Sequence, residues 1–142
     1  MKLFLDTNVW LRLFIPDNEN LFLQAKRLIE LAEEGKVRLS TSTFVLSEFI
    51  YVESSFYRID KKNIIEDLEG ISSIKNIRII DSTNFNKALK LFKKSKERKW
   101  SDCVIISQVP ENYFLCSFDL RLRYLIGKKR FFTPQEVVEK IE

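Results

Sequence analysis

The sequence predicts an α/β fold, a three-layer α/β/α sandwich whose central, mostly parallel sheet has four to five short strands. Short apolar segments of about four residues alternate with longer segments in which apolar residues recur at helical spacing. Strands this apolar need helices over both faces, which is typical of parallel sheets. The length of 142 residues, with only three glycines and three prolines, fits one domain over residues 1–142.

In the first half of the chain, strands are expected over 2–5 and 37–40, and helices over 8–14, 17–34, 43–57 and 60–74. Pro16 stops the first helix, and Gly35 follows the second where helix ends favour glycine. The third helix is apolar almost all round, so we expect it to be well buried. Asp60 is a suitable N-cap for the fourth.

In the second half, strands are expected over 77–80, 113–117 and 131–132, and helices over 84–99, 101–106, 120–126 and from 134 to the C-terminus. The helix over 84–99 is amphipathic, with Phe85 and Phe92 facing inward and its lysines outward. Ser101 can cap the next helix. The run TPQE at 133–136 is a capping box with proline at the first helical position.

The composition excludes several classes of chemistry. The chain has no histidine, so it cannot use Ser-His-Asp or Cys-His catalysis, a histidine base or a histidine zinc site. It has no apolar window of about 18 residues and its first residues do not resemble a signal peptide, so we expect a cytoplasmic protein without a membrane partner. Cys103 and Cys116 are then expected to be buried, reduced thiols.

Charge is divided unevenly along the chain. Residues 1–71 hold 9 Lys/Arg and 12 Asp/Glu, whereas residues 72–142 hold 15 and 8. The densest basic stretch includes Lys93, Lys94 and Lys96, and a second one includes Arg121. Such tracts suit a polyanion, but they are equally compatible with the solvated face of a helix.

Three acids stand directly after expected strands: Asp6, Asp81 and Asp119. Ligands of open parallel sheets bind outside the carboxyl ends of the strands, so all three are candidates for a site. Each also precedes an expected helix, where aspartate is a favoured cap. Local pattern does not separate the two roles.

Two further acids lie in apolar surroundings. Glu48 is inside the most apolar helix, where a glutamate is rare unless it is paired or bound to a cation. Asp102 lies near the start of a helix beside an apolar run, so either the helix dipole or a cation can explain it. Glu53 lies on a different face from Glu48 and is expected to be solvated.

Asp6, Glu48, Asp102 and Asp119 could therefore converge at one edge of the sheet. Hard divalent cations such as Mg²⁺ and Mn²⁺ favour several oxygen ligands. Such an ion lowers the pKa of water and stabilises charge on phosphoryl oxygens without any histidine. With a basic second half nearby, the natural substrate is a phosphodiester chain.

At these acids the sequence resembles the PIN-domain nucleases, and most closely the small VapC-like toxins of type II toxin–antitoxin modules. The motifs are LDTNVW around Asp6, LSEFIY around Glu48, WSDCVIIS around Asp102 and CSFDLRL around Asp119. Each motif alone is weak, but the four occur in the family's order and the resemblance spans essentially the whole chain.

The resemblance implies a Mg²⁺- or Mn²⁺-dependent endoribonuclease in which these four acids are catalytic and hold metal. Thr7, Asn8 and Ser117 match secondary polar positions of the family, and Asp81 matches a position that is not catalytic, so we assign it to capping. We expect Lys93, Lys94, Lys96 and Arg121 to contact RNA. The resemblance further implies a homodimer and a cognate antitoxin as partners.

Other protein classes also use an aspartate after the first strand. A response-regulator receiver needs an adjacent acidic pair after that strand and a late lysine near a proline, and neither is evident here. A haloacid-dehalogenase-like phosphatase needs a second aspartate two residues after the first, where this chain has Asn8. A housekeeping RNA-processing PIN nuclease and a non-catalytic PIN module that binds RNA or acts as a scaffold both stay open. The retention of all four acids favours an active enzyme, and the small size favours a toxin.

Overall fold

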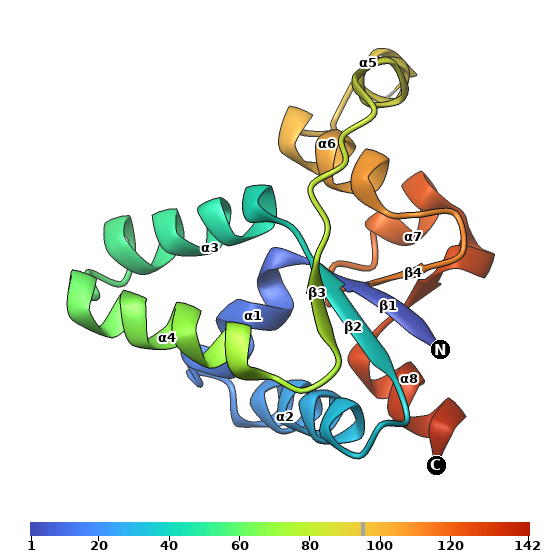
Figure 1. Ribbon diagram of the computed structural model, residues 1–142. Coiled ribbons are helices and arrows are strands. Elements are labelled where there is room, and N and C mark those ends of the chain that lie inside the picture. The colour runs from blue at the N-terminus through green and yellow to red at the C-terminus, as the bar shows by residue number, and fades with distance from the viewer. Residues whose placement is uncertain (95) are drawn as a thin grey trace.

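The computed structural model describes residues 1–94 and 96–142, and it confirms the expected α/β sandwich (Figure 1). Within these residues, five strands form one sheet in the order β3-β2-β1-β4-β5, and every neighbouring pair is parallel. The strands are β1 (Lys2–Leu5), β2 (Arg38–Thr41), β3 (Ile77–Ile79), β4 (Phe114–Cys116) and β5 (Phe131–Phe132).

Helices cover both faces of this sheet. They are α1 (Thr7–Phe14), α2 (Glu19–Glu33), α3 (Thr43–Ser55), α4 (Lys61–Ser73), α5 (Phe85–Lys94), α6 (Trp100–Gln108), α7 (Leu122–Ile126) and α8 (Pro134–Ile141), with a 3₁₀ turn at Lys128–Arg130. On one side α2 packs against α1 and α8, and α1 also contacts α3; on the other side α6 packs against α5 and α7. In Figure 1, α3 and α4 extend together to the left, while α5 and α6 project at the top.

The core is built around β1, the central strand. Leu3, Phe4 and Leu5 are completely buried because β2 and β4 flank the strand and helices cover both of its faces. The indole of Trp10 in α1 is also fully buried, and its N–H donates to the Thr41 hydroxyl at the end of β2 (3.1 Å). A buried polar group with a partner avoids most of the desolvation cost, so this bond fixes α1 on the sheet.

Most of the local signals are confirmed. Gly35 adopts a positive φ of 77° after α2, and the bonds from Gly35 N–H to Ala32 and from Lys36 N–H to Leu31 satisfy the last carbonyls of that helix. Asp60 caps α4 through the Asn63 N–H, and Thr133 forms the expected capping box.

Two local predictions need correction. The helix predicted over 84–99 is α5, which ends at Lys94, and residue 95 lies outside the described residues. Ser101 does not cap α6, because this helix already begins at Trp100 after Lys99, which makes no side-chain cap bond. Lys93 and Lys94 of the basic stretch therefore belong to the last turn of α5, whereas Lys99 stands directly before α6.

None of the helices within residues 1–94 and 96–142 combines the length and the apolarity that crossing a membrane requires.

The strand order creates a position where ligands bind in open parallel sheets. The chain moves from β1 to β2 and β3 on one side, and then returns to β4 and β5 on the other side of β1. The connections leave the carboxyl ends of β1 and β4 in opposite directions, which opens a crevice between them. Asp6 follows β1, and Ser117 and Asp119 follow β4, so all three reach this crevice.

Candidate metal centre

Asp6 lies at the carboxyl end of the central strand and also starts α1. One carboxylate oxygen, Oδ1, accepts the N–H of Thr7 (2.8 Å), and the other, Oδ2, accepts the Ser117 hydroxyl (2.7 Å). The side chain is only 6% exposed. Asp6 is therefore both a helix cap and a carboxylate that faces the crevice, so the two readings of this residue are not exclusive.

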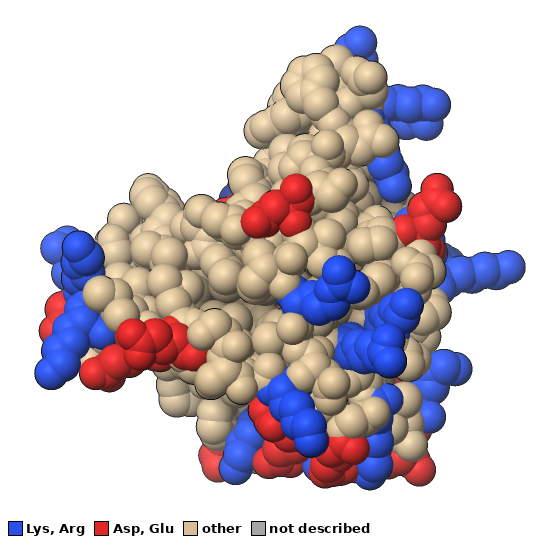
Figure 2. Space-filling model, viewed as in Figure 1, with Lys and Arg blue, Asp and Glu red and all other residues tan. Residues whose placement is uncertain are grey.

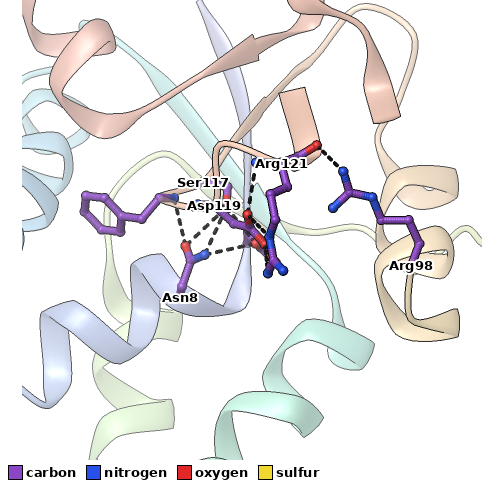
Figure 3. A network of polar contacts seen from close by, with 7 residues as sticks. Asn8, Arg98, Ser117, Asp119 and Arg121 are labelled. Atoms are coloured by element: carbon purple, nitrogen blue, oxygen red, sulfur yellow. Dashed lines mark hydrogen bonds and ion pairs between the residues drawn. The ribbon is translucent and has the colours of Figure 1, made fainter. Parts of the chain in front are cut away.

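Asn8 and Ser117 connect the ends of β1 and β4 (Figure 3). The Asn8 amide donates to the Ser117 hydroxyl (3.0 Å) and its carbonyl accepts the Phe118 N–H (3.0 Å). The Ser117 hydroxyl also accepts the Asp119 N–H (3.0 Å). This network fixes the position of Asp6 relative to the start of the loop that carries Asp119.

Glu48 reaches the crevice from α3. Its Oε1 accepts the Thr7 hydroxyl (3.0 Å), so the first turn of α1 orients a carboxylate from another helix. Burial raises the pKa of Glu48, the hydrogen bond from Thr7 opposes this shift, and the negative charge of Asp102 adds to it. Glu48 is thus not a buried core residue but a half-buried acid beside another acid.

Asp102 enters from the opposite face of the sheet, in the first turn of α6. Burial and then the charge of Asp119 raise its pKa, whereas Lys99 and Arg98 act in the opposite direction. The first turn of a helix favours an acid, but it does not explain why Asp102 lies so close to a second one.

Asp119 is held by Arg121 (Figure 3). The guanidinium of Arg121 donates from Nε and Nη2 to the two carboxylate oxygens, both at 2.9 Å. This pairing keeps the pKa of Asp119 below its usual range. Arg98 donates to the Arg121 carbonyl (2.8 Å), which ties the segment before α6 to this loop.

The four acids line one pocket of about 190 Å³. Its lining comprises Asp6, Glu48, Asp102 and Asp119 together with Thr7, Asn8, Leu11, Lys99 and Arg121. In the part of the chain that the structure describes, no three of the carboxylates converge closely enough to hold one ion in common. The acids share a pocket without forming such a group.

The electrostatics of this pocket fit a hard divalent cation. The pKa of Asp6 is raised to about 6, first by burial and also by the negative charges of Asp102 and Glu48. Acids that raise one another's pKa carry negative charge that the pocket does not fully neutralise, and a bound cation would relieve the repulsion. The donors are carboxylate oxygens with hydroxyl and amide oxygens behind them, which suits Mg²⁺ or Mn²⁺ better than a soft metal.

Asp81, the third acid at a strand end, does not line the pocket. Its two carboxylate oxygens accept the N–H and the hydroxyl of Thr43, each at 2.6 Å. It therefore stabilises the start of α3 instead of capping the helix that follows it in sequence. Its separation from the other acids agrees with its assignment as a structural residue.

The basic residues divide into two groups. Lys93 and Lys94 lie in the last turn of α5 and Lys96 follows it; all three are exposed and none lines the pocket. Lys99 does line it, although sequence reasoning did not select it. Its place three residues before Asp102 in the same basic stretch was the available signal.

One prediction about an acid is wrong. Glu53 of α3 was expected to be solvated, but its side chain is completely buried. Within residues 1–94 and 96–142, neither of its carboxylate oxygens has a hydrogen-bond partner of good geometry. Burial, and the neighbouring acid Asp67 on α4, raise its pKa to about 8.

A larger apolar cavity of about 630 Å³ lies between α3 and α4, away from the four acids.

A family model described as PIN domain matches residues 3–125. Among solved structures, a chain of VapBC2 from Rickettsia felis, determined bound to a DNA fragment from its promoter, is 19% identical with a TM-score of 0.68; the match covers 94% of this chain and 98% of that one. A chain of VapBC-1 from nontypeable Haemophilus influenzae is 18% identical with a TM-score of 0.62, covering 95% and 99%. No curated protein matches the sequence. At these identities the two structures establish a shared fold.

Proposed function

Because the chain belongs to the PIN domain family, we propose that it is a divalent-metal-dependent endoribonuclease and the toxin of a type II toxin–antitoxin pair. The observation that carries this proposal is the single pocket lined by Asp6, Glu48, Asp102 and Asp119. These acids come from four separate segments. The strand order places all four segments at the crevice between the carboxyl ends of β1 and β4. A purely structural role for each acid would not require them to share a pocket.

The four acids would hold Mg²⁺ or Mn²⁺. When bound, such an ion acts as a Lewis acid on a phosphoryl oxygen and lowers the pKa of water. Thr7 orients Glu48 through its hydroxyl, and Ser117 does the same for Asp6. Lys99 adds a positive charge at the pocket, where a phosphate would bind.

The proposed substrate is RNA, whose phosphates would be attracted by the basic second half of the chain. We expect Lys93, Lys94, Lys96 and Arg121 to contact the phosphate backbone, which would make affinity depend on salt. Arg121 is the one of these four that lies at the acid pocket. The three lysines would contact nucleotides farther along the strand.

The proposed protein partners are an antitoxin and a second copy of the chain. Support for an antitoxin comes from the fold that this chain shares with chains of VapBC2 and VapBC-1. Co-expression with a small protein encoded directly upstream of this chain tests it: we expect the two proteins to purify together and RNA cleavage to be blocked, and the absence of any such gene would count against an antitoxin. Sedimentation velocity of the purified chain tests the dimer.

The decisive experiment is cleavage-site mapping on total RNA with Mn²⁺, Mg²⁺ or EDTA, comparing the wild type with Asp6→Asn. We expect discrete cuts by the wild type with either metal, and none with EDTA or with the variant. Equal cutting by both proteins would contradict the proposed metal site. RNA that is bound but left intact by the wild type would favour the non-catalytic RNA-binding module.

A further inference from the structure

Three aromatic rings form a cluster where α5 packs on α6. The Trp100 ring centroid lies 5.9 Å from that of Phe85 and 5.6 Å from that of Phe92, with interplanar angles of 66° and 70°. These edge-to-face contacts hold the indole in place. Trp100 is the first residue of α6, and Asp102 lies in the first turn of the same helix. The cluster is thus rigidly connected to the acid pocket.

The cluster is partly open to solvent. Phe85 is 61% exposed, Phe92 42% and Trp100 37%. The amphipathic pattern predicted that Phe85 and Phe92 face inward, but of the α5 side chains only Ala88 is fully buried, against Cys103 and Val104 of α6. Three large rings exposed side by side form a patch of the kind that marks a binding surface.

The charge around the cluster has one dominant sign. Residues 85–101 contain seven Lys/Arg and a single acid, Glu97. On the face shown in Figure 2, the projecting end formed by α5 displays Lys and Arg but no Asp or Glu. Lys99, the residue before Trp100, lines the acid pocket, so the positive segment leads from the aromatic cluster to the acids.

This charge distribution discriminates between two possible occupants. A second copy of the chain would place two strongly basic segments against each other, which is unfavourable without compensating acids. A polyanion gains from the same charges. Exposed aromatic rings beside a basic track are the arrangement by which proteins bind single strands, because every unpaired base has a face that can stack. The bases of a duplex are already stacked on one another.

We propose that Trp100, supported by Phe85 and Phe92, is a stacking platform for an unpaired base of a single-stranded RNA whose backbone runs on past Lys99 to the acid pocket. This inference rests on the proposed function in taking RNA as the ligand. It adds the place on this chain where an unpaired base would bind, at the start of α6. It also assigns binding to base faces as well as to phosphates.

The intrinsic fluorescence of Trp100 provides a probe of base binding. Of its two tryptophans, Trp10 is fully buried and bonded to Thr41, so quenching by a bound base reports on Trp100. Asp6→Asn protein is titrated with an eight-nucleotide single-stranded RNA and with an abasic oligonucleotide of the same length. We expect the RNA to quench the fluorescence and the abasic strand to leave it unchanged.

The second arm measures affinity by anisotropy of labelled oligonucleotides. Trp100→Ala in the Asp6→Asn background should weaken binding of the RNA by about tenfold and leave binding of the abasic strand unchanged. Trp100→Phe, which keeps a ring for stacking, should lose much less. Tyr51→Ala removes a ring on α3 that is 70% exposed and serves as the matched control, with no loss expected. Circular dichroism and thermal melting check that each variant is folded.

Two results would overturn the proposal. One is an equal loss of affinity for both oligonucleotides, or no loss for either, in folded Trp100→Ala protein. The other is the conversion of a dimer to a monomer by Trp100→Ala in sedimentation velocity with the preference for bases retained, which would identify the cluster as a contact between copies. Because the Asp6→Asn protein is used, the result does not depend on cleavage. Failure of the proposed function would show separately, as RNA left uncut by the wild type.

Discussion

Arg121 holds Asp119 through both carboxylate oxygens, with two guanidinium hydrogen bonds of 2.9 Å and a third bond of 3.0 Å from its backbone N–H. These bonds occupy the oxygens that Asp119 would offer to a cation. Arg121 and a divalent metal are therefore expected to compete for the same acid. The guanidinium is largely exposed, so it can turn away when a metal takes its place.

Arg121→Ala should therefore bind Mn²⁺ several-fold more tightly than the wild type, because the competing positive charge is gone. Isothermal titration with Mn²⁺ in the absence of RNA measures this directly. Arg123→Ala removes a nearby arginine that pairs with Glu136 outside the pocket, and it should leave metal affinity unchanged. Weaker Mn²⁺ binding by Arg121→Ala would show that Arg121 prepares Asp119 for the metal.

Asp6→Asn and Asp102→Asn should each abolish RNA cleavage with Mn²⁺ while the proteins stay folded. Asparagine retains an oxygen acceptor for Ser117 at residue 6 but not the negative charge that a cation needs. Cleavage of a labelled RNA and thermal melting are measured side by side. Full activity in both variants would exclude the metal site.

Asp81→Asn should leave cleavage nearly intact and lower the free energy of unfolding by about 1 kcal/mol, the usual effect of losing a bond at a helix start. The reason is that, among the residues that the structure describes, the hydrogen bonds of the Asp81 carboxylate go to Thr43 at the start of α3, and Asp81 does not line the acid pocket. Urea unfolding and RNA cleavage test the two halves of this expectation. A large loss of cleavage at normal stability would mean that Asp81, too, belongs to the catalytic acids.

Glu53→Gln should stabilise the protein increasingly as pH rises. The folded-state pKa of Glu53 is raised to about 8 from an ordinary value of 4.5. Its contribution to stability is then present below pH 4.5 and is lost as pH rises through the folded pKa, since the buried carboxyl must lose its proton. Glutamine stays neutral and avoids this loss.

Urea unfolding of both proteins at pH 5, 6.5 and 8 measures the difference, which we expect to be smallest at pH 5 and largest at pH 8. Glu66→Gln, at an exposed position on α4, is the matched control. A difference that is constant across this range would mean that Glu53 titrates normally in the folded protein.

Replacing Lys93, Lys94 and Lys96 by glutamine should weaken RNA binding and reduce the slope of its salt dependence. Each phosphate contact that is lost removes about one released counterion from the slope. Binding to Asp6→Asn protein measured from low to moderate salt gives both quantities. An unchanged slope would mean that these lysines do not contact phosphates and only form a solvated helix face.

Much of the fold could be predicted, because strands and helix ends are marked by residues that are close together in the sequence. The apolar run ending at Asp6 marks a strand, Asp60 and Thr133 mark helix starts, and the order of segments indicates a parallel sheet. The acids Glu48 and Asp102 were recognisable because charged residues in apolar helices need a partner. These predictions did not require knowing which helices and strands pack against one another.

What the sequence could not provide depends on contacts between distant segments. The helix that carries Glu53 is apolar almost all round, so its pattern does not indicate which side meets α4. Phe85 and Phe92 contact Trp100 at the start of α6 and still remain exposed, and the helical pattern of α5 does not show how much of each ring the neighbouring helix covers. Asp119 and Arg121 are two residues apart, so their ion pair could have been predicted. Their spacing alone, however, does not distinguish an ion pair from two charges that are separately solvated.

The position of β1 has a consequence for the time at which the acid pocket forms. The Asp6 N–H bonds to the Cys116 carbonyl, and its carboxylate accepts from Ser117, 111 residues further along the chain. At about 5–20 residues per second, translation separates these partners by roughly 6–20 seconds. A growing chain that has not yet released β4 carries Asp6 without its partners. The protein therefore emerges beside ribosomal RNA with its pocket still unassembled, and only a nearly finished chain can complete it.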